Sequence, residues 1–331
     1  MSFYKMNYKT FIEDVRQKCL NGVVLSRQEI ISLLKIGDTG DECDLLRKTA
    51  FEVAKLKTDG KAYLWGAIGI DYIPCPMNCD FCSFGAKWGV VREKKVITRE
   101  QIADYVKDYV DSMAHYVVFR TTQYYNVEDL EKLAEYVRAK VPGNYELVLN
   151  TGELNRAQAD RLYKAGVGCI YHAIRLREGT DTRFDINVRR ATLAAIRDSD
   201  LKLVHLIEPV GNEHTNEEIA DRFMESLEYG VSISGIMARI PVEGTPLGKT
   251  KRISDSKMAK LVAVTRLSGG DIVKDICVHP ASEIAVRSGA NVVVIEKGAI
   301  PRDTEITNKE WNQFSCSDAI KLFKRNGYKI A

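Results

Sequence analysis

Eight short apolar runs, each followed by a stretch with the periodicity of an amphipathic helix, fill the chain from residue 61 onward. Apolar runs that alternate with helical segments are typical of a parallel sheet. Eight such units are the number that closes a (β/α)8 barrel, although a doubly wound open sheet has the same periodicity. We therefore predict an α/β protein with a full (β/α)8 TIM barrel. Its strands are expected at residues 62–70, 116–120, 145–150, 169–174, 202–208, 231–240, 271–278 and 291–297.

Helical segments flank this pattern at both ends. Apolar periodicity predicts helices within residues 1–60, and Ser26 followed by Glu29 has the spacing of a capping box. The chain has 331 residues, which suits one barrel with additions. We predict an N-terminal helical extension over residues 1–60, the barrel over residues 61–300 and a C-terminal helical extension over residues 301–331.

The charge distribution argues against two classes of partner. The formal net charge is +3, and bases and acids are mixed along the chain. No apolar run approaches the roughly 18 residues of a membrane span, and the first residues lack the apolar core of a secretory leader. We expect a cytoplasmic protein with no nucleic-acid or membrane partner. In that compartment thiols stay reduced, so clustered cysteines indicate metal binding.

Such a cluster follows the first predicted strand, in "PCPMNCDFCSFG" at residues 74–85. Cys75, Cys79 and Cys82 are three soft ligands, suited to zinc or to an iron–sulfur cluster. A structural zinc site takes four protein ligands, usually in two pairs, yet the other five cysteines are scattered. Iron–sulfur cubanes in ferredoxins also use four cysteines. A cubane held by only three would leave one iron open to bind a small molecule.

The C-x-x-x-C-x-x-C loop, with aromatic Phe81 before its last cysteine, resembles the signature of the radical S-adenosylmethionine (SAM) superfamily. The resemblance implies a [4Fe-4S] cluster whose open iron chelates the amino and carboxylate groups of SAM. One-electron reduction then cleaves SAM to a 5′-deoxyadenosyl radical, which abstracts hydrogen from an unactivated carbon. An electron donor such as flavodoxin or ferredoxin is implied as well.

Further segments resemble the branch that contains biotin synthase, methylornithine synthase and the hydrogenase maturase. In biotin synthase, too, proline follows the first cysteine of the loop. Four downstream stretches are similar to landmarks of this branch: "LNTGELNRAQADRLYKAGV", "AIRDSDLKLVHLIEPVGNE", "IPVEGTPL" at residues 240–247 and "RSGANVVVIEKG" at residues 287–298. The resemblance runs from about residue 20 to the end of the chain.

The resemblance also implies residues that bind SAM. Phe81 is expected near the adenine, or simply sealing the loop against the barrel. Glu178 falls where relatives hold the SAM ammonium, a charge-assisted contact. Arg189 falls where biotin synthase directs an arginine at the SAM carboxylate, and the adjacent Arg190 is the alternative. Gly211 and Glu213 are expected to shape the adenine turn.

Polar residues near strand ends are the candidates for substrate contacts. His172 lies on the fourth predicted strand, His205 on the fifth, and His279 follows the seventh; all three are expected to face the barrel mouth. Arg120, Thr122 and Tyr125 follow the second strand and are expected to contact SAM or substrate. The substrate is expected to be a small molecule or a group on an acyl carrier.

The chain departs from biotin synthase at the second cluster, which donates sulfur in that enzyme. Cysteines expected on the second and third strands are absent, His205 occupies the place of the fifth-strand cysteine, and Cys277 lies near the arginine position. One hypothesis is a second cluster held by another set: Cys169, His205, Cys277 and Cys316. That hypothesis, which we favour at this stage, predicts sulfur insertion into a precursor of the biotin or lipoyl type.

Two alternatives remain open from the sequence. The chain could lack a second cluster and catalyse a carbon-skeleton rearrangement or a bond cleavage, as the methylornithine synthase and hydrogenase maturase lineages do. It could also be a non-catalytic iron–sulfur carrier or scaffold. A scaffold would transfer its cluster without turning over SAM.

Overall fold

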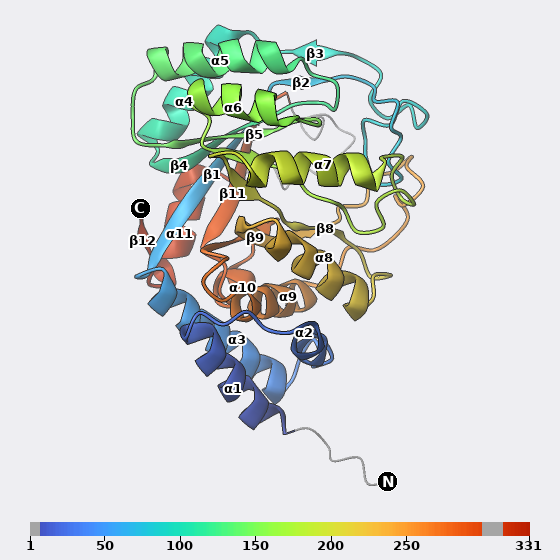
Figure 1. Cartoon of the computed structure of the whole chain (residues 1–331). Helices are drawn as coiled ribbons and strands as arrows, with labels where there is room; N and C mark the ends of the chain where they lie inside the picture. The colour runs from blue at the N-terminus through green and yellow to red at the C-terminus, as the bar shows by residue number, and fades with distance from the viewer. Residues whose placement is uncertain (1–6, 300–313) are drawn as a thin grey trace.

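The computed structural model describes residues 7–299 and 314–331. Its main sheet is a closed ring of parallel strands, because β10 pairs with both β9 and β11 (Figure 1). The predicted barrel is therefore confirmed, and the open sheet is excluded. The ring consists of β1 (Lys61–Gly69), β4 (Ala114–Arg120), β5 (Glu146–Asn150), β6 (Cys169–Tyr171), β7 (Lys202–Val204) with β8 (Ile207–Val210), β9 (Val231–Ala238), β10 (Asp275–His279) and β11 (Val292–Gly298).

Three predicted strands differ most from those observed. The run at 202–208 is divided into β7 and β8, which both pair with β9 across register shifts. The run at 169–174 forms a strand only as far as Tyr171, and the run at 271–278 begins its strand at Asp275. Apolar content predicted these strands well, but strand ends depend on pairing with neighbours, which are distant in sequence.

Helices surround the ring, and polar side chains cap the starts of most of them. Thr98, Asn126 and Asn155 accept hydrogen bonds from backbone N–H groups at the starts of α4, α5 and α6. The other barrel helices begin in the same way, except α10. The helices are α4 (Arg99–Asp111), α5 (Val127–Lys140), α6 (Arg156–Lys164), α7 (Ile186–Arg197), α8 (Asn216–Glu228), α9 (Asp255–Ser268) and α10 (Glu283–Val286).

The additions at both ends lie away from the carboxyl ends of the strands. Helices α1 (Tyr8–Leu20), α2 (Arg27–Leu34) and α3 (Asp41–Lys57) pack against α8 and α9, and the predicted capping box at Ser26 is present (Figure 1). Helix α11 (Cys316–Arg325) leads to β12 (Lys329–Ile330), which pairs with the start of β1. Residues 300–313, where the predicted barrel and C-terminal extension meet, lie outside the described residues.

Two apolar layers result from the alternation of side chains along each strand. Outward side chains such as Ile170 and Val278 join the helices in one cluster. Inward side chains such as Trp65, Val148 and Cys277 fill the ring. None of the helices in the described part of the chain is both long and apolar enough to cross a membrane.

Candidate functional site

The three clustered cysteines lie in one irregular loop at the carboxyl end of β1. The loop leaves the short strand β2 (Asp71–Tyr72) and returns through β3 (Lys95–Val96), which pairs with β2 in antiparallel fashion. In a (β/α)8 barrel this end of the strands carries the functional loops. The structure thus places Cys75, Cys79 and Cys82 at the expected end of the barrel.

Hydrogen bonds within the loop fix its shape. The Cys75 N–H donates to the Phe84 carbonyl at 2.6 Å, and the Trp88 indole donates to the Cys79 carbonyl at 3.0 Å. Asn78 has a φ of 45°, a left-handed conformation that asparagine tolerates better than most residues. Its side-chain oxygen accepts from the Lys87 N–H at 2.8 Å. The loop is thus preorganised by its own residues.

The thiols themselves are suited to holding a metal cluster. Cys75 and Cys79 form no disulfide. Burial raises the pKa of Cys79 to about 12, an effect that the positive charge of Arg175 partly offsets. Burial also raises the pKa of Cys75, and the charges of Cys75, Cys79 and Cys82 influence one another. Bound metal would compensate this cost, because thiolates are the ligands and metal binding displaces their protons.

A cavity of about 230 Å³ opens beneath the cysteine loop, inside the carboxyl end of the barrel. Phe81, Cys82 and Phe84 of the cysteine loop line one side of it, and Trp65, Tyr171 and Cys277 line its apolar part. Phe81 thus lines the cavity wall. A concave, largely apolar space with a few polar groups is typical of a small-molecule site.

Arg120 and His279, which were candidates from the sequence, line this cavity. Four charged residues that were not identified from the sequence line it as well: Arg175, Glu208, Arg239 and Glu296. Each lies within or directly after the carboxyl end of a predicted strand, and a charge at such a position was the available signal. Three arginines and two glutamates in one cavity suit a small substrate that carries both negative and positive groups.

Glu208 is the most buried carboxyl group of the cavity. It is 8% exposed, the Tyr171 hydroxyl donates to it, and its Oε1 lies 3.8 Å from Arg175 Nε. Burial raises the pKa of Glu208, although Arg175 opposes this. The group can therefore hold a proton closer to neutral pH than an exposed glutamate can.

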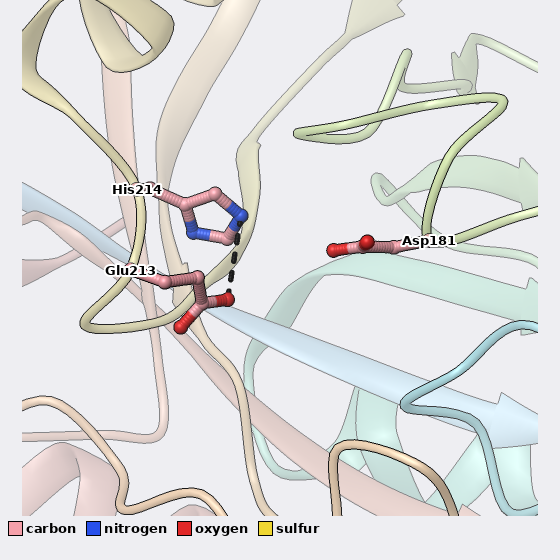
Figure 2. A group of neighbouring side chains, drawn as sticks. All are labelled: Asp181, Glu213 and His214. Carbon is pink, nitrogen blue, oxygen red and sulfur yellow. Dashed lines mark ion pairs between the residues drawn. The ribbon is translucent and has the colours of Figure 1, made fainter.

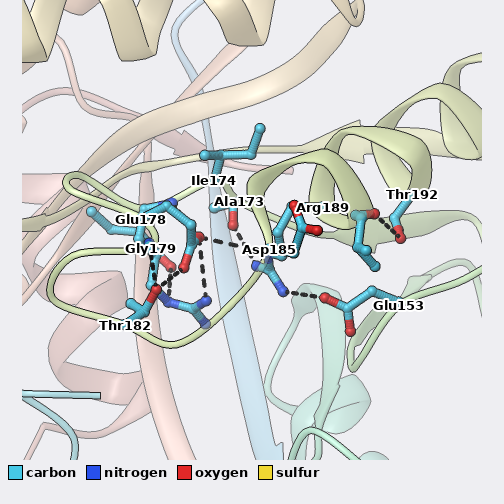
Figure 3. A network of polar contacts seen from close by, with 12 residues as sticks. Glu153, Ala173, Ile174, Glu178, Gly179, Thr182, Asp185, Arg189 and Thr192 are labelled. Carbon is cyan, nitrogen blue, oxygen red and sulfur yellow. Dashed lines mark hydrogen bonds and ion pairs between the residues drawn. The ribbon is translucent and has the colours of Figure 1, made fainter. Parts of the chain in front are cut away.

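Glu178 and Arg189 belong to a polar network beside the cavity (Figure 3). The Glu178 side chain is fully buried, and it accepts from the Thr182 hydroxyl at 2.6 Å and from the Arg175 N–H at 2.8 Å. Arg189, on α7, donates to Glu153 at 3.1 Å and to the Ala173 carbonyl. Its Nε lies 3.6 Å from Glu178.

The two adjacent arginines of α7 point in opposite directions. The Arg189 side chain is 3% exposed and faces the network, whereas that of Arg190 is 44% exposed and pairs with Glu225. Among the two candidates, only Arg189 has a side chain directed toward the barrel. Its role toward SAM stays a prediction.

Gly211 and Glu213 form a tight turn after β8. Both oxygens of Glu213 pair with the guanidinium of Arg239, which is 3% exposed. Burial would raise the pKa of Glu213, but the hydrogen bonds from Arg239 lower it to about 2. The Gly211 N–H donates to His214 Nδ1 at 2.9 Å. The expected adenine turn is thus held together by an ion pair that the sequence did not indicate.

Replacing Gly211 by alanine is expected to destabilise this turn. A Cβ there would lie 2.5 Å from Glu213 Oε2 and 2.6 Å from Arg239 Cζ, so the pair would have to separate. We expect a loss of about 1–3 kcal/mol in the free energy of unfolding, measured by urea denaturation. Gly143→Ala, whose Cβ would meet nothing closer than 3.3 Å, is the control. Equal stabilities of the two variants would contradict this account.

Asp181, Glu213 and His214 offer ligand atoms within 4.8 Å of one another (Figure 2). In residues 7–299 and 314–331 this is the one group of three or more His, Cys, Asp or Glu side chains that lie so close together. Two contacts oppose a cation here. Arg239 already neutralises Glu213, and His214 Nδ1 accepts a hydrogen bond, which leaves the proton on Nε2. The three loop thiols do not form such a close group within the described residues.

The predicted substrate residues separate into three places. Arg120 and His279 line the barrel cavity. Thr122 and Tyr125 line a second cavity of about 310 Å³ on the outer side of the loop, together with Cys75. There the Thr122 N–H donates to Asp71 at 2.8 Å.

The prediction that His172 and His205 face the barrel mouth is wrong. Their neighbours in sequence, such as Tyr171 and Val204, fill the barrel interior, so strand alternation turns both histidines outward toward the helices. Both are fully buried there. Burial lowers the pKa of each, and the positive charge of Arg189 lowers that of His172 further, as Arg222 does for His205. Neither histidine lines the cavity.

Acid is expected to destabilise the protein through His205. Burial lowers its pKa from 6.5 to about 3, so the unfolded chain binds more protons between these values. The contribution of His205 to the free energy of unfolding is complete above about pH 6.5. It falls as the pH decreases toward 3, by ~2 kcal/mol at pH 5. Urea denaturation at several pH values measures it. His205→Gln, which keeps an acceptor for the Ile174 N–H, should show a shallower pH slope; an unchanged slope would contradict this.

The residues suggested for a second cluster are not brought together. Cys277 lines the cavity, and Cys169 lies in the barrel interior without reaching the cavity. His205 is on the outward face of its strand, and Cys316 packs among the outer helices near Ser112 and Lys297. A ligand set that includes His205 and Cys316 is therefore wrong. His205 faces away from the barrel interior, and Cys316 lies outside the barrel among the helices.

Comparisons with known proteins agree with the expected branch. No protein-family model matches the chain. Biotin synthase of Persephonella marina is 22% identical over 271 residues, 78% of each chain, and that of Clostridium botulinum is 22% identical over 325 residues, 95% of this chain and 98% of its own. Methylornithine synthase has a TM-score of 0.78 at 16% identity, covering 96% of this chain and 97% of its own. HydG, a maturase of the FeFe-hydrogenase, has a TM-score of 0.79 at 12% identity, covering 98% and 76%.

Proposed function

On the premise that the chain belongs to the biotin synthase-like branch of the radical SAM superfamily, we propose that it is a radical SAM enzyme with a [4Fe-4S] cluster on Cys75, Cys79 and Cys82. When bound, such a cluster supplies an electron that cleaves SAM and so generates a radical able to abstract hydrogen. Its substrate would lie in the cavity beneath the cysteine loop.

The loop's composition is the observation that carries this proposal. It supplies three thiols on a preorganised backbone, and one of them, Cys82, lines the cavity. Of the other five cysteines, only Cys277 reaches that cavity, and it does so from β10. The loop itself thus offers no fourth thiolate, and a cubane there would keep one iron available for SAM.

Residues around the cavity would bind and orient the ligands. Arg175 would hold a carboxylate, and the apolar walls would exclude water from the reacting carbon. Glu208, with its raised pKa, would donate or accept a hydrogen bond according to its protonation. Phe81 would pack against a bound ring.

For the reaction, we favour a rearrangement or a bond cleavage on a small substrate with no second cluster. Only one cysteine, Cys277, lines the cavity besides Cys82, while five charged side chains and a histidine surround it. Sulfur insertion is the second candidate, favoured by Cys277 in the cavity and by relatives that are biotin synthases. Neither candidate identifies the substrate.

Anaerobic reconstitution tests the proposal. The protein with about four irons per chain, given SAM and dithionite, is expected to form 5′-deoxyadenosine well above a control that lacks protein. An intact cluster without this product, but with transfer of the cluster to an acceptor apoprotein, would instead support a scaffold.

Iron and sulfide counts separate the two reactions. About four irons per chain, unchanged in Cys277→Ala, would support rearrangement or cleavage. About eight irons, partly lost in Cys277→Ala, would support an internal sulfur donor.

A further inference from the structure

Positive charge is concentrated around the cysteine loop. Residues 84–95 carry four cations and one acid, and residues 242–252 carry three cations and one acid. Their combined charge exceeds the net +3 of the whole chain, so the remainder is slightly negative. We call the exposed side chains of these two segments the basic face: Lys87, Arg92, Lys94, Lys95, Lys249, Lys251 and Arg252.

The two segments adjoin each other in space. A Cβ on Gly244 would lie 3.1 Å from Val90, and the Leu247 N–H donates to the Asp80 carbonyl of the cysteine loop at 2.9 Å. Both segments emerge at the same side of the barrel (Figure 1). A protein partner of ordinary interface size covers about 20–30 residues, enough to span both.

Most of these cations are not used within the chain. Among the residues that the structure describes, Lys87, Lys94, Lys95, Lys249 and Lys251 form no ion pair with a carboxylate, whereas Arg252 pairs with Asp255. Unpaired surface cations at one site raise the local potential and attract a partner of opposite charge. Lys94 lines the outer cavity together with two acids, Asp71 and Asp129.

Apolar surface lies beside the charges, at a proposed cluster ligand. Tyr124 is 69% exposed and Val96 is 50% exposed. Both line the outer cavity together with Cys75 and Lys94. An apolar centre next to a charged rim is the usual anatomy of a protein interface. A partner seated here would lie directly against Cys75.

From this arrangement we propose that the basic face is the docking surface for an acidic one-electron carrier protein of the flavodoxin or ferredoxin kind. The inference rests on the proposed function, because a cluster on Cys75 must receive one electron from outside the chain in each cycle. The carrier would be oxidised by one electron and the cluster reduced by one. Opposite charge steers the encounter, and Tyr124 with Val96 supplies contact area.

The test compares two reductants and two pairs of variants. Lys95→Glu and Lys251→Glu, singly and together, reverse charge on each segment without altering either cavity's lining. Lys321→Glu with Lys324→Glu, on exposed positions of α11, is the matched control. Binding of an acidic flavodoxin is measured by calorimetry at about 50 mM and about 300 mM salt. Formation of 5′-deoxyadenosine is then measured with reduced flavodoxin and, separately, with dithionite.

We expect each single reversal to weaken flavodoxin binding about 3–10-fold and the double variant about 10–100-fold, with a smaller salt dependence. Dithionite-driven product should stay within about twofold of wild type. Equal flavodoxin binding in wild type and double variant, or an equal loss in the α11 control, would overturn the proposal. So would preferential binding of an RNA oligonucleotide that the same double variant loses.

The reductants also separate the two proposals. If wild type forms no product with dithionite, the proposed function fails, while calorimetry still reports on docking. If the double variant loses product with both reductants equally, its residues serve cluster loading, and the docking proposal fails.

Discussion

Replacing Cys79 by alanine should reduce the iron content of the reconstituted protein to background and abolish 5′-deoxyadenosine formation. Cys79 is 8% exposed, and its carbonyl is held by Trp88, so a neighbouring thiol cannot move into its place. Two thiolates hold a cubane poorly, since cysteines supply its protein ligands. We expect a loss of more than about 100-fold in product, measured by chromatography beside iron and sulfide assays.

Cys316→Ala is the matched control for Cys79→Ala. Cys316 is a half-buried cysteine at the start of α11, remote from the loop. Its replacement should leave the iron content and the product unchanged. If Cys316→Ala lost iron as Cys79→Ala does, or if Cys79→Ala kept its iron, the assignment of the cluster to the loop would be wrong.

Replacing Arg189 by leucine is expected to destabilise the protein strongly. The change leaves the fully buried Glu178 without its Arg189 partner and removes the hydrogen bond to Glu153 (Figure 3). Breaking a buried pair from one side costs about 3–5 kcal/mol, because the remaining charge stays desolvated. Urea denaturation measures the loss.

Arg190→Leu, one position further along the same helix, is the control. It removes the same charge from an exposed position, so a difference between the two variants reports the effect of burial. The Arg190 pair with Glu225 is partly exposed, so we expect a change of about 1 kcal/mol or less. Arg189→Lys should recover only part of the stability, because one ammonium cannot reproduce a forked guanidinium. Similar losses for Arg189→Leu and Arg190→Leu would show that the network around Glu178 does not stabilise the fold.

Strand parity explains the main error in the predicted site. Polar residues near strand ends were expected at the barrel mouth, but successive residues of a strand face opposite sides. His172 follows the inward Tyr171, and His205 follows the inward Val204, so both face the helices. The break between β7 and β8 then shifts the register of the fifth strand. Glu208 lies an odd number of residues after the outward His205, so the same alternation turns it inward and it lines the cavity.

The sequence alone determined the features that depend on near neighbours. Eight apolar runs predicted the alternation of strands and helices because each element buries its own face at its own period, whereas closure of the ring was decided by strand pairing. The spacing of Cys75, Cys79 and Cys82 placed three thiols on one loop, because residues so close in sequence are constrained to lie together in space. The capping box at Ser26 was local in the same sense.

Only the tertiary structure decided which distant residues meet. The Arg239 pair with Glu213 and the cavity between Cys82 and Cys277 each join segments that follow different strands. The same is true of the basic face, whose two segments lie about half the chain apart in sequence. Such contacts depend on closure of the ring and on strand register, which no short stretch of sequence encodes, because they are set by packing among all eight strands at once.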